Sequence, residues 1–156
     1  MVLRTWCLIT SDENWRVCKT RSVWGLDYGY RVTWDHYISQ GDPAIVYVNK
    51  KGFAAVVEVG EKFYDENPIG WSKVYPYRFR ITIKKEGGPL RISSSVRRPS
   101  PDSEQAVHHN PNAIDQIVFI TDKGVGERGG ARWNNFVFPS LVAIPQEDFV
   151  TVQSKL

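Results

Sequence analysis

Short apolar runs and one alternating stretch predict that this chain is built mainly from β-strands. The alternation is clearest over residues 77–84, where Tyr77, Phe79, Ile81 and Ile83 are separated by arginine, threonine and lysine side chains. One face of that strand is therefore apolar and the other cationic, and the cationic face is interpreted as the solvent side. The predicted strands are 4–10, 44–48, 53–59, 77–84, 114–121 and 141–144, and residues 90–92 are a candidate resumption of the strand over 77–84.

Polar and glycine-rich segments separate these strands. The sequence Asn49-Lys50-Lys51-Gly52 predicts a tight hairpin turn between the second and third strands. The run Gly87-Gly88-Pro89 is expected to end the long strand that begins at Tyr77. Residues 93–111 are rich in serine, proline and charge, which predicts a flexible surface loop.

Three helices are predicted from capping signals and spacing. Thr10 and Glu13 have the spacing of a capping box, so a helix is expected over 11–21. A second short helix is expected over 33–40, where apolar residues recur at helical spacing before a glycine. A last helix begins at Pro145, because proline suits the first helical position and acidic residues follow it.

The order of these elements predicts the fold class. Helices and strands do not alternate regularly, which excludes a doubly wound parallel sheet and favours an α+β fold. The expected architecture is a small, mostly antiparallel β-barrel with flanking short helices. A length of 156 residues suits a single domain over 1–156, and 42% hydrophobic and 24% charged residues are ordinary for a soluble domain.

Composition narrows the setting and the partners. Cys7 and Cys18 are too few for a disulfide framework and are expected to be reduced and buried, which favours a cytoplasmic location. No metal-ligand spacing, signal peptide or membrane span is found in the sequence, and no cofactor is expected. A net charge of +3 permits a polyanionic partner without requiring one.

The stretch from residue 10 to residue 25 carries the candidate chemistry. Asn14 falls in the first helical turn, and Trp24 follows ten residues later, beside a glycine expected to let the backbone turn sharply. The helix is therefore expected to hold an amide and an indole over one pocket that suits a flat ligand. Six tryptophans in a small domain leave room for some with exposed faces. The alternative is that Trp24 plugs the end of the barrel.

Four motifs along the chain carry a family resemblance. They are Glu13-Asn14-Trp15 ahead of Val23-Trp24-Gly25, then Gly41-Asp42, then Tyr75-Pro76-Tyr77-Arg78, and finally the stretch from Ser140 to Phe149. In order and spacing they resemble the EVE domain family, which belongs to the PUA-like superfamily and is related to YTH domains. The resemblance covers nearly the whole chain. It implies a PUA-like β-barrel with flanking helices and a pocket for a modified base, in DNA for some EVE proteins and in methylated RNA for YTH relatives.

The resemblance also implies roles for five side chains. Trp24 matches one wall of the YTH aromatic cage, and Trp71 resembles the second wall. Asn14 matches a polar residue that contacts the base edge, while Thr10 and Ser11 stand where relatives place another base contact.

These residues predict a non-enzymatic nucleic-acid-binding module. It would recognise a modified or flipped base, such as a methylated or hydroxymethylated base, in an aromatic pocket. Cationic side chains that can contact phosphates without reading sequence are Arg31, Arg78, Arg80, Arg97 and Arg98. DNA and RNA both remain open as partners, as do the modification and the oligomeric state.

Two other functions are compatible with the sequence. PUA-like relatives of the ASCH type include small amidohydrolases, and one acting on modified nucleosides would draw on Lys19, Thr10 and Glu58, which qualify by residue type alone. No triad order, metal cluster or carboxylate pair accompanies them in the sequence. The other alternative is a protein-interaction module whose aromatic side chains form a partner surface.

Overall fold

The elements of the fold are given by a computed structural model that describes residues 4–92, 113–114 and 141–156. In chain order they are β1 (Trp6–Thr10), α1 (Asp12–Arg21), β2 (Val23–Leu26), a 3₁₀ helix (Tyr28–Tyr30), a π-helical turn (Thr33–Tyr37), β3 (Pro43–Val48), β4 (Gly52–Tyr64), β5 (Tyr77–Ile92), β6 (Ala113–Ile114), β7 (Leu141–Ala143) and α5 (Gln146–Lys155). None of the helices in this part of the chain is long and apolar enough to cross a membrane. The predicted loop over 93–111 and most of the predicted strand over 114–121 lie outside the described residues.

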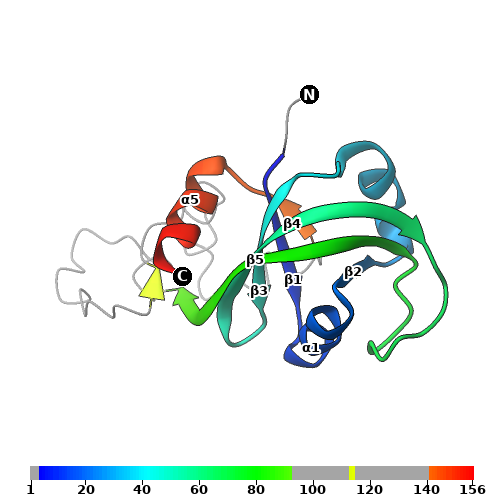
Figure 1. The fold of residues 1–156 in the computed structure, drawn as a ribbon, viewed down its shortest axis with the longest axis horizontal. Coiled ribbons are helices and arrows are strands. Elements are labelled where there is room, and N and C mark those ends of the chain that lie inside the picture. The colour runs from blue at the N-terminus through cyan, green and yellow to red at the C-terminus, as the bar shows by residue number, and fades with distance from the viewer. Residues whose placement is uncertain (1–3, 93–112, 115–140) are drawn as a thin grey trace, which may run out of the picture.

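The strands form one curled, mixed sheet, a half-barrel (Figure 1). Its order is β2-β5-β4-β3-β1-β7, and β6 pairs with the end of β5. β1 and β3 are parallel and β5 meets β6 in parallel, while the other neighbouring pairs are antiparallel. Register shifts along β4 are β-bulges, which bend a strand and increase its twist. The predicted α+β fold, a small and mostly antiparallel β-barrel with flanking short helices, is confirmed, with the sheet curled into a half-barrel.

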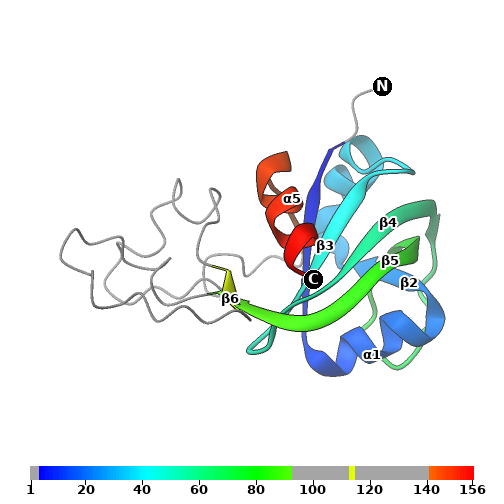
Figure 2. The ribbon, with the colours of Figure 1, turned by 60° about the vertical axis from the view of Figure 1, so that its left-hand side comes forward.

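Each face of the sheet packs against its own helix. Side chains alternate along β1, so that Leu8 belongs to the core cluster that contains Trp15 of α1. Ile9 belongs to a second cluster, which contains Val152 of α5. Figure 2 shows the two helices on opposite sides of the strands. The alternation of the strand therefore assigns each helix its face.

The start of α1 differs from the prediction by one residue. Ser11 is the N-cap, and its Oγ accepts a hydrogen bond from the backbone N–H of Asn14 at 3.2 Å. Thr10 is still part of β1, where it pairs with Val48, and it cannot cap the helix from there. The capping box predicted from Thr10 and Glu13 is therefore wrong, although the predicted helix exists.

The long strand β5 does not end where glycine and proline predicted a break. It continues through residues 87–89, and Leu90 pairs with Phe53 of β4. Leu90 and Phe53 are both buried in the second core cluster. Pairing with a long neighbour and burial of an apolar side chain thus outweigh the local preference of the two glycines.

The predicted helix over 33–40 is shorter than expected. It is a π-helical turn that ends at Tyr37, because Ile38 returns to extended backbone and is buried with 1% of its surface exposed. This early end leaves the backbone N–H of Ser39 without a helical partner. It donates instead to the carboxylate of Asp42 at 2.9 Å.

Asp42 is a buried residue whose carboxylate accepts hydrogen bonds from several N–H groups. Besides Ser39, its oxygens accept hydrogen bonds from the Trp6 indole at 2.9 Å and from the backbone N–H of Arg4 at 3.2 Å. We refer to Arg4, Trp6, Ser39 and Asp42 as the Asp42 cluster. It lies where β1 and β3 begin, because Trp6 pairs with Ala44.

Candidate functional site

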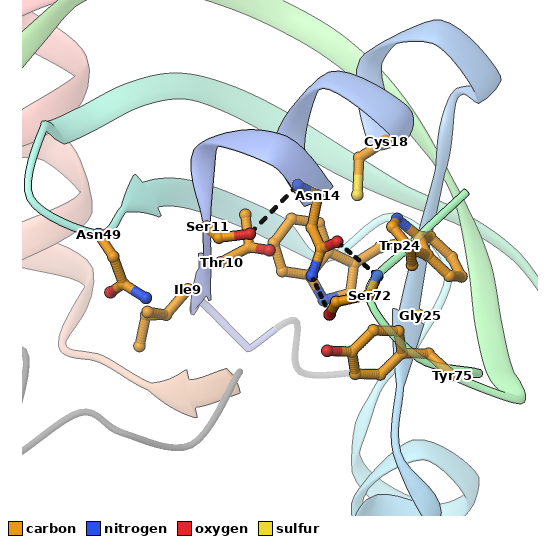
Figure 3. Close-up of a pocket in the computed structure, with 11 residues that line it drawn as sticks. Ile9, Thr10, Ser11, Asn14, Cys18, Trp24, Gly25, Asn49, Ser72 and Tyr75 are labelled. Atoms are coloured by element: carbon orange, nitrogen blue, oxygen red, sulfur yellow. Dashed lines mark hydrogen bonds between the residues drawn. The ribbon is translucent and has the colours of Figure 1, made fainter. Parts of the chain in front are cut away.

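A pocket of about 280 Å³ lies at the other end of the same two strands. β1 and β3 are parallel, so their carboxyl ends meet at one edge of the sheet, where Thr10 and Asn49 line the pocket. Helix α1, strand β2 and the segment before β5 complete the wall (Figure 3). The lining consists of Ile9, Thr10, Ser11, Asn14, Cys18, Trp24, Gly25, Asn49, Trp71, Ser72 and Tyr75. We call it the indole pocket.

The five residues that the sequence predicted for a base-binding pocket all lie in this lining. They come from three separate segments, and the structure brings them together as Thr10, Ser11, Asn14, Trp24 and Trp71. Their contact with a base stays a prediction. The lining also contains no charged side chain.

Trp24 is a buried wall of the pocket, on strand β2. Only 2% of its surface is exposed, and its ring packs against that of Trp15 with centroids 6.5 Å apart. Its indole nitrogen is the one buried side-chain nitrogen or oxygen, among the described residues, that has no hydrogen-bond partner. Buried indole N–H groups usually have a hydrogen-bond acceptor, so the wall formed by Trp24 has one unsatisfied donor.

Trp71 is held in place by Arg78, which the sequence had assigned to phosphate binding. The Arg78 guanidinium lies 5.2 Å from the centroid of the Trp71 ring. Only 2% of the Arg78 surface is exposed. It donates to the backbone carbonyls of Tyr75, at 2.9 Å, and Asn67, and it pairs with Asp65 at 3.3 Å. Arg78 is therefore not available to phosphate. The alternation of strand β5 placed it on the solvent face, but the segment that carries Trp71 folds over it.

Asn14 fixes the same segment from the opposite side. Its amide oxygen accepts from the backbone N–H of Ser72 at 3.0 Å, and its amide nitrogen donates to the Ser72 hydroxyl at 3.2 Å (Figure 3). A backbone N–H can only donate, so this pair determines which way the amide faces. One N–H and one lone pair of Asn14 remain for a ligand. Asn14 is thus a clamp for the pocket wall, whether or not it also contacts a base.

Gly25 is required by close packing, not by a turn. It lies within β2, opposite Arg78. A Cβ atom added there would lie 2.7 Å from the Trp71 ring and 2.6 Å from Cβ of Tyr75. The predicted sharp turn at Gly25 is therefore wrong, and the glycine instead admits two aromatic side chains against the strand.

Cys18 closes the inner part of the pocket as a neutral thiol. Burial raises its pKa to about 12, and a hydrogen bond with the Trp71 side chain only partly opposes this. Both Cys7 and Cys18 are buried and free, as the sequence predicted. A thiol with so high a pKa is a poor nucleophile near neutral pH.

Other predicted cations lie away from the pocket. Arg31 and Arg80 are exposed, and the Arg80 guanidinium lies 4.7 Å from the Phe63 ring centroid. Neither lines the pocket. Arg97 and Arg98 lie outside the described residues.

Three lysines that the sequence analysis did not single out lie next to lining residues. Lys50 and Lys51 follow Asn49, and both are exposed. Lys73 follows Ser72, and its ammonium lies 5.4 Å from the ring centroid of Tyr75. Lys51 pairs with Asp12 at 3.0 Å and Lys73 with Asp27 at 3.3 Å. Cations therefore border the pocket at two places.

The residues considered for an amidohydrolase are separated in the structure. Thr10 lines the pocket, but Lys19 pairs with Glu86 at 3.1 Å and Glu58 pairs with Lys84 at 3.7 Å, and neither lines the pocket. Glu58 pairs with Pro43, at the far end of β3 from Thr10. The catalytic alternative therefore has no assembled set of groups among the described residues.

Six lining residues were not predicted as part of the pocket: Ile9, Cys18, Gly25, Asn49, Ser72 and Tyr75. Asn49 had a usable signal, because it follows a strand that could lie beside β1. Tyr75 follows Trp71 by four positions, and the two rings meet edge to face with centroids 5.5 Å apart. No local pattern indicates that contact, since the segment is not helical.

Comparison with known proteins finds relatives that match nearly the whole length of the chain. No family model matches the sequence. Its homologues are UPF0310 proteins: one from Pyrococcus horikoshii is 26% identical over 168 residues, covering 97% of each chain. The resemblance to the EVE family therefore remains an expectation.

Solved structures support the fold. A hypothetical protein from Leishmania major matches with a TM-score of 0.55 at 11% identity, covering 98% of this chain and 94% of that one. A YTH domain from Zygosaccharomyces rouxii, solved in complex with N6-methyladenosine RNA, matches with a TM-score of 0.48 at 15% identity, covering 83% of this chain and 89% of that one. The first of these likenesses extends over nearly the whole of both chains.

Proposed function

We propose that this protein is a non-enzymatic nucleic-acid-binding module that receives a modified or flipped base in the indole pocket. The observation that carries the proposal is the pocket itself, which combines two indole side chains with hydroxyl and amide groups and has no charged lining residue. A nucleobase is flat, polar at its edge and uncharged at neutral pH. These are the properties that such a lining selects.

The size of the pocket favours a single base. Its volume of about 280 Å³ is near the lower end of the range of roughly 300–1,000 Å³ for small-molecule sites. Stacking of a base on an aromatic side chain is worth about 1–3 kcal/mol, which offsets the loss of its neighbours in a strand. An added methyl group contributes about 0.8 kcal/mol if it is buried, enough for about fourfold discrimination.

The lysines beside the pocket provide for the phosphate backbone. Lys50 has an exposed side chain at the hairpin turn, next to Asn49 in the lining. Lys73 lies on the other side, over Tyr75. Neutralising phosphates with lysines releases counterions, so binding should weaken as salt rises. Lys50→Ala is expected to reduce the slope of log affinity against log salt by about 1.

The direct test is fluorescence anisotropy with labelled single-stranded oligonucleotides. Each carries one methylated adenine, methylated cytosine or hydroxymethylated cytosine, as RNA and as DNA, beside its unmodified counterpart. One modified base should bind about fourfold or more tightly than its counterpart. Trp71→Ala should weaken that binding at least about fivefold, since it removes a stacking face.

Trp34→Ala is the matched control. Trp34 is a half-buried indole that contacts Tyr77 and does not line the pocket. If Trp34→Ala and Trp71→Ala weaken binding equally, the pocket is not the binding site. If no oligonucleotide binds, the proposed function is wrong.

A protein-interaction module is the second candidate. Tyr28, Val32, Tyr37 and Tyr64 are large side chains that are 46–62% exposed, and the hydroxyls of Tyr28 and Tyr64 both donate to Glu66. Binding to a protein partner that is insensitive to salt and is abolished by Tyr28→Ser, but not by Trp71→Ala, would favour this function.

A further inference from the structure

Among the described residues, buried indole N–H groups differ in whether they have an acceptor. The Trp6 indole donates to Asp42 and the Trp34 indole to the carbonyl of Arg78, both at 2.9 Å. The Trp24 indole nitrogen is buried and has no acceptor among the described residues.

Packing does not explain the missing acceptor. Trp24 is buried, with the Trp15 ring of α1 against it and Phe79 of β5 as its partner across the ladder. Yet it also lines a pocket with hydroxyl and amide groups on other walls. A donor buried without a partner destabilises the free protein, and a bound molecule that supplies an acceptor removes that cost.

We infer that the Trp24 N–H is a specificity determinant that donates a hydrogen bond to an acceptor on the bound base. This rests on the proposed function of the indole pocket. An indole N–H can donate but never accept, so the polarity of the contact is fixed. The acceptor is an unsubstituted ring nitrogen or a carbonyl oxygen. A base that carries a proton or an alkyl group on that atom is refused, whatever its modification elsewhere.

Trp24 and Trp71 then have different roles in binding. Trp71 also lines the pocket, with its ring beside the Arg78 guanidinium, and its assigned role is that of a stacking face. Trp24 contributes a directional contact as well. Affinity for flat rings in general should therefore depend on both residues, whereas discrimination between bases of equal size should depend on Trp24.

An acceptor scan tests this. Oligonucleotides carrying methylated adenine or methylated cytosine are compared with deaza and deoxo analogues in which one acceptor atom at a time is replaced by C–H. On the wild-type protein, one analogue is expected to bind about tenfold more weakly than its parent. On Trp24→Phe, which keeps an aromatic ring and lacks the N–H, parent and analogue should bind equally.

Trp71→Phe is the matched control in the same pocket. It should weaken binding of every oligonucleotide and preserve the tenfold preference for the parent. A second variant separates the contact from folding: benzothienylalanine in place of Trp24 keeps the ring shape and lacks the donor. That variant should be at least as stable to urea as the wild type, because the N–H has no partner to lose, and should bind like Trp24→Phe.

Each outcome decides the matter. If the wild type binds a parent oligonucleotide but no acceptor deletion separates it from Trp24→Phe, the role of the N–H is overturned while the proposed function stands. If benzothienylalanine lowers stability, the N–H has a structural partner and the inference fails. If the wild type binds no oligonucleotide of the series, the proposed function fails and the inference falls with it.

Discussion

The two ends of strands β1 and β3 differ in whether their buried N–H groups have hydrogen-bond acceptors. In the Asp42 cluster, where the strands begin, the Trp6 indole and two backbone N–H groups all donate to one carboxylate. In the indole pocket, where the strands end, the equally buried Trp24 indole has no acceptor. An unpartnered buried group costs about 1–3 kcal/mol, so the first end is complete in the free protein and the second is not.

The pocket is incomplete although its walls are well supported. Arg78 holds the segment that carries Trp71 through two backbone carbonyls, and Asn14 holds Ser72 through two hydrogen bonds. A loosely packed region could relax until every donor found an acceptor. A rigidly held region cannot rearrange in this way, so its unsatisfied donor stays available to a ligand. The contrast predicts that the two ends respond differently to substitution.

Asp42→Ala should have the largest effect on stability. It leaves three N–H groups without their acceptor and is expected to lower the free energy of unfolding by about 4 kcal/mol. Urea unfolding monitored by circular dichroism measures this, with the exposed Asp35→Ala as control. Oligonucleotide affinity per folded molecule should not change. Equal loss of stability in both variants would show that the cluster does not support the fold.

Arg78→Met should damage both stability and the pocket. The change removes a buried donor to two backbone carbonyls and the cation beside Trp71, and the free energy of unfolding is expected to fall by about 3 kcal/mol. Oligonucleotide binding should fall with it, because Trp71 is no longer held. Arg80→Met, an exposed arginine on the same strand, is the matched control. A stable Arg78→Met variant with weaker salt dependence would instead restore Arg78 as a phosphate ligand.

Gly25→Ala tests the close packing of the pocket wall. The new methyl group would lie within 2.7 Å of Trp71 and Tyr75, so these rings must move at a cost of about 2 kcal/mol. Trp fluorescence and urea unfolding measure the two consequences. Gly29→Ala is the control, since its added Cβ would meet only the Asp27 side chain at 3.3 Å. If both variants retain wild-type stability and binding, the aromatic contacts at Gly25 are not tight.

Local patterns were sufficient for the parts of the fold that depend on neighbouring residues. The apolar run before residue 10 and the hairpin at Asn49–Gly52 gave β1, β3 and β4 because burial and turn chemistry are written in adjacent positions. Local patterns failed where pairing with a distant strand determines the extent of an element. Strand β5 continues through Gly87–Pro89 because Leu90 pairs with Phe53 of β4. The boundary of α1 shifted because Thr10 is paired with Val48.

The same distinction between local and distant contacts applies to the residues of the site. Trp24, Asn14 and their neighbours were predicted as one pocket because they flank a single helix and match a family resemblance. Arg78 was misassigned, since alternation along β5 says nothing about the segment that folds over it. Gly25 was interpreted as a turn because a glycine that admits two distant aromatic rings looks the same in sequence as one that bends the chain.

The smallest expected effect is the pH dependence of Cys18, on the inner wall of the pocket. Burial raises the pKa of its thiol from 9.0 to about 12, so folding favours the neutral form. Its contribution to stability is complete below pH 9 and is lost as pH rises towards 12. At about pH 10 the loss from this thiol should be about 1 kcal/mol. Urea unfolding at pH 8 and pH 10 should therefore show a smaller decline for Cys18→Ala than for the wild type. Burial also raises the pKa of Cys7, in the other core cluster, so Cys7→Ala should show a comparable reduction.

A decline in the stability of Cys18→Ala as steep as that of the wild type would mean that water reaches the Cys18 thiol through the pocket. The pocket wall would then not be rigidly packed, and the contrast with the Asp42 cluster would no longer hold.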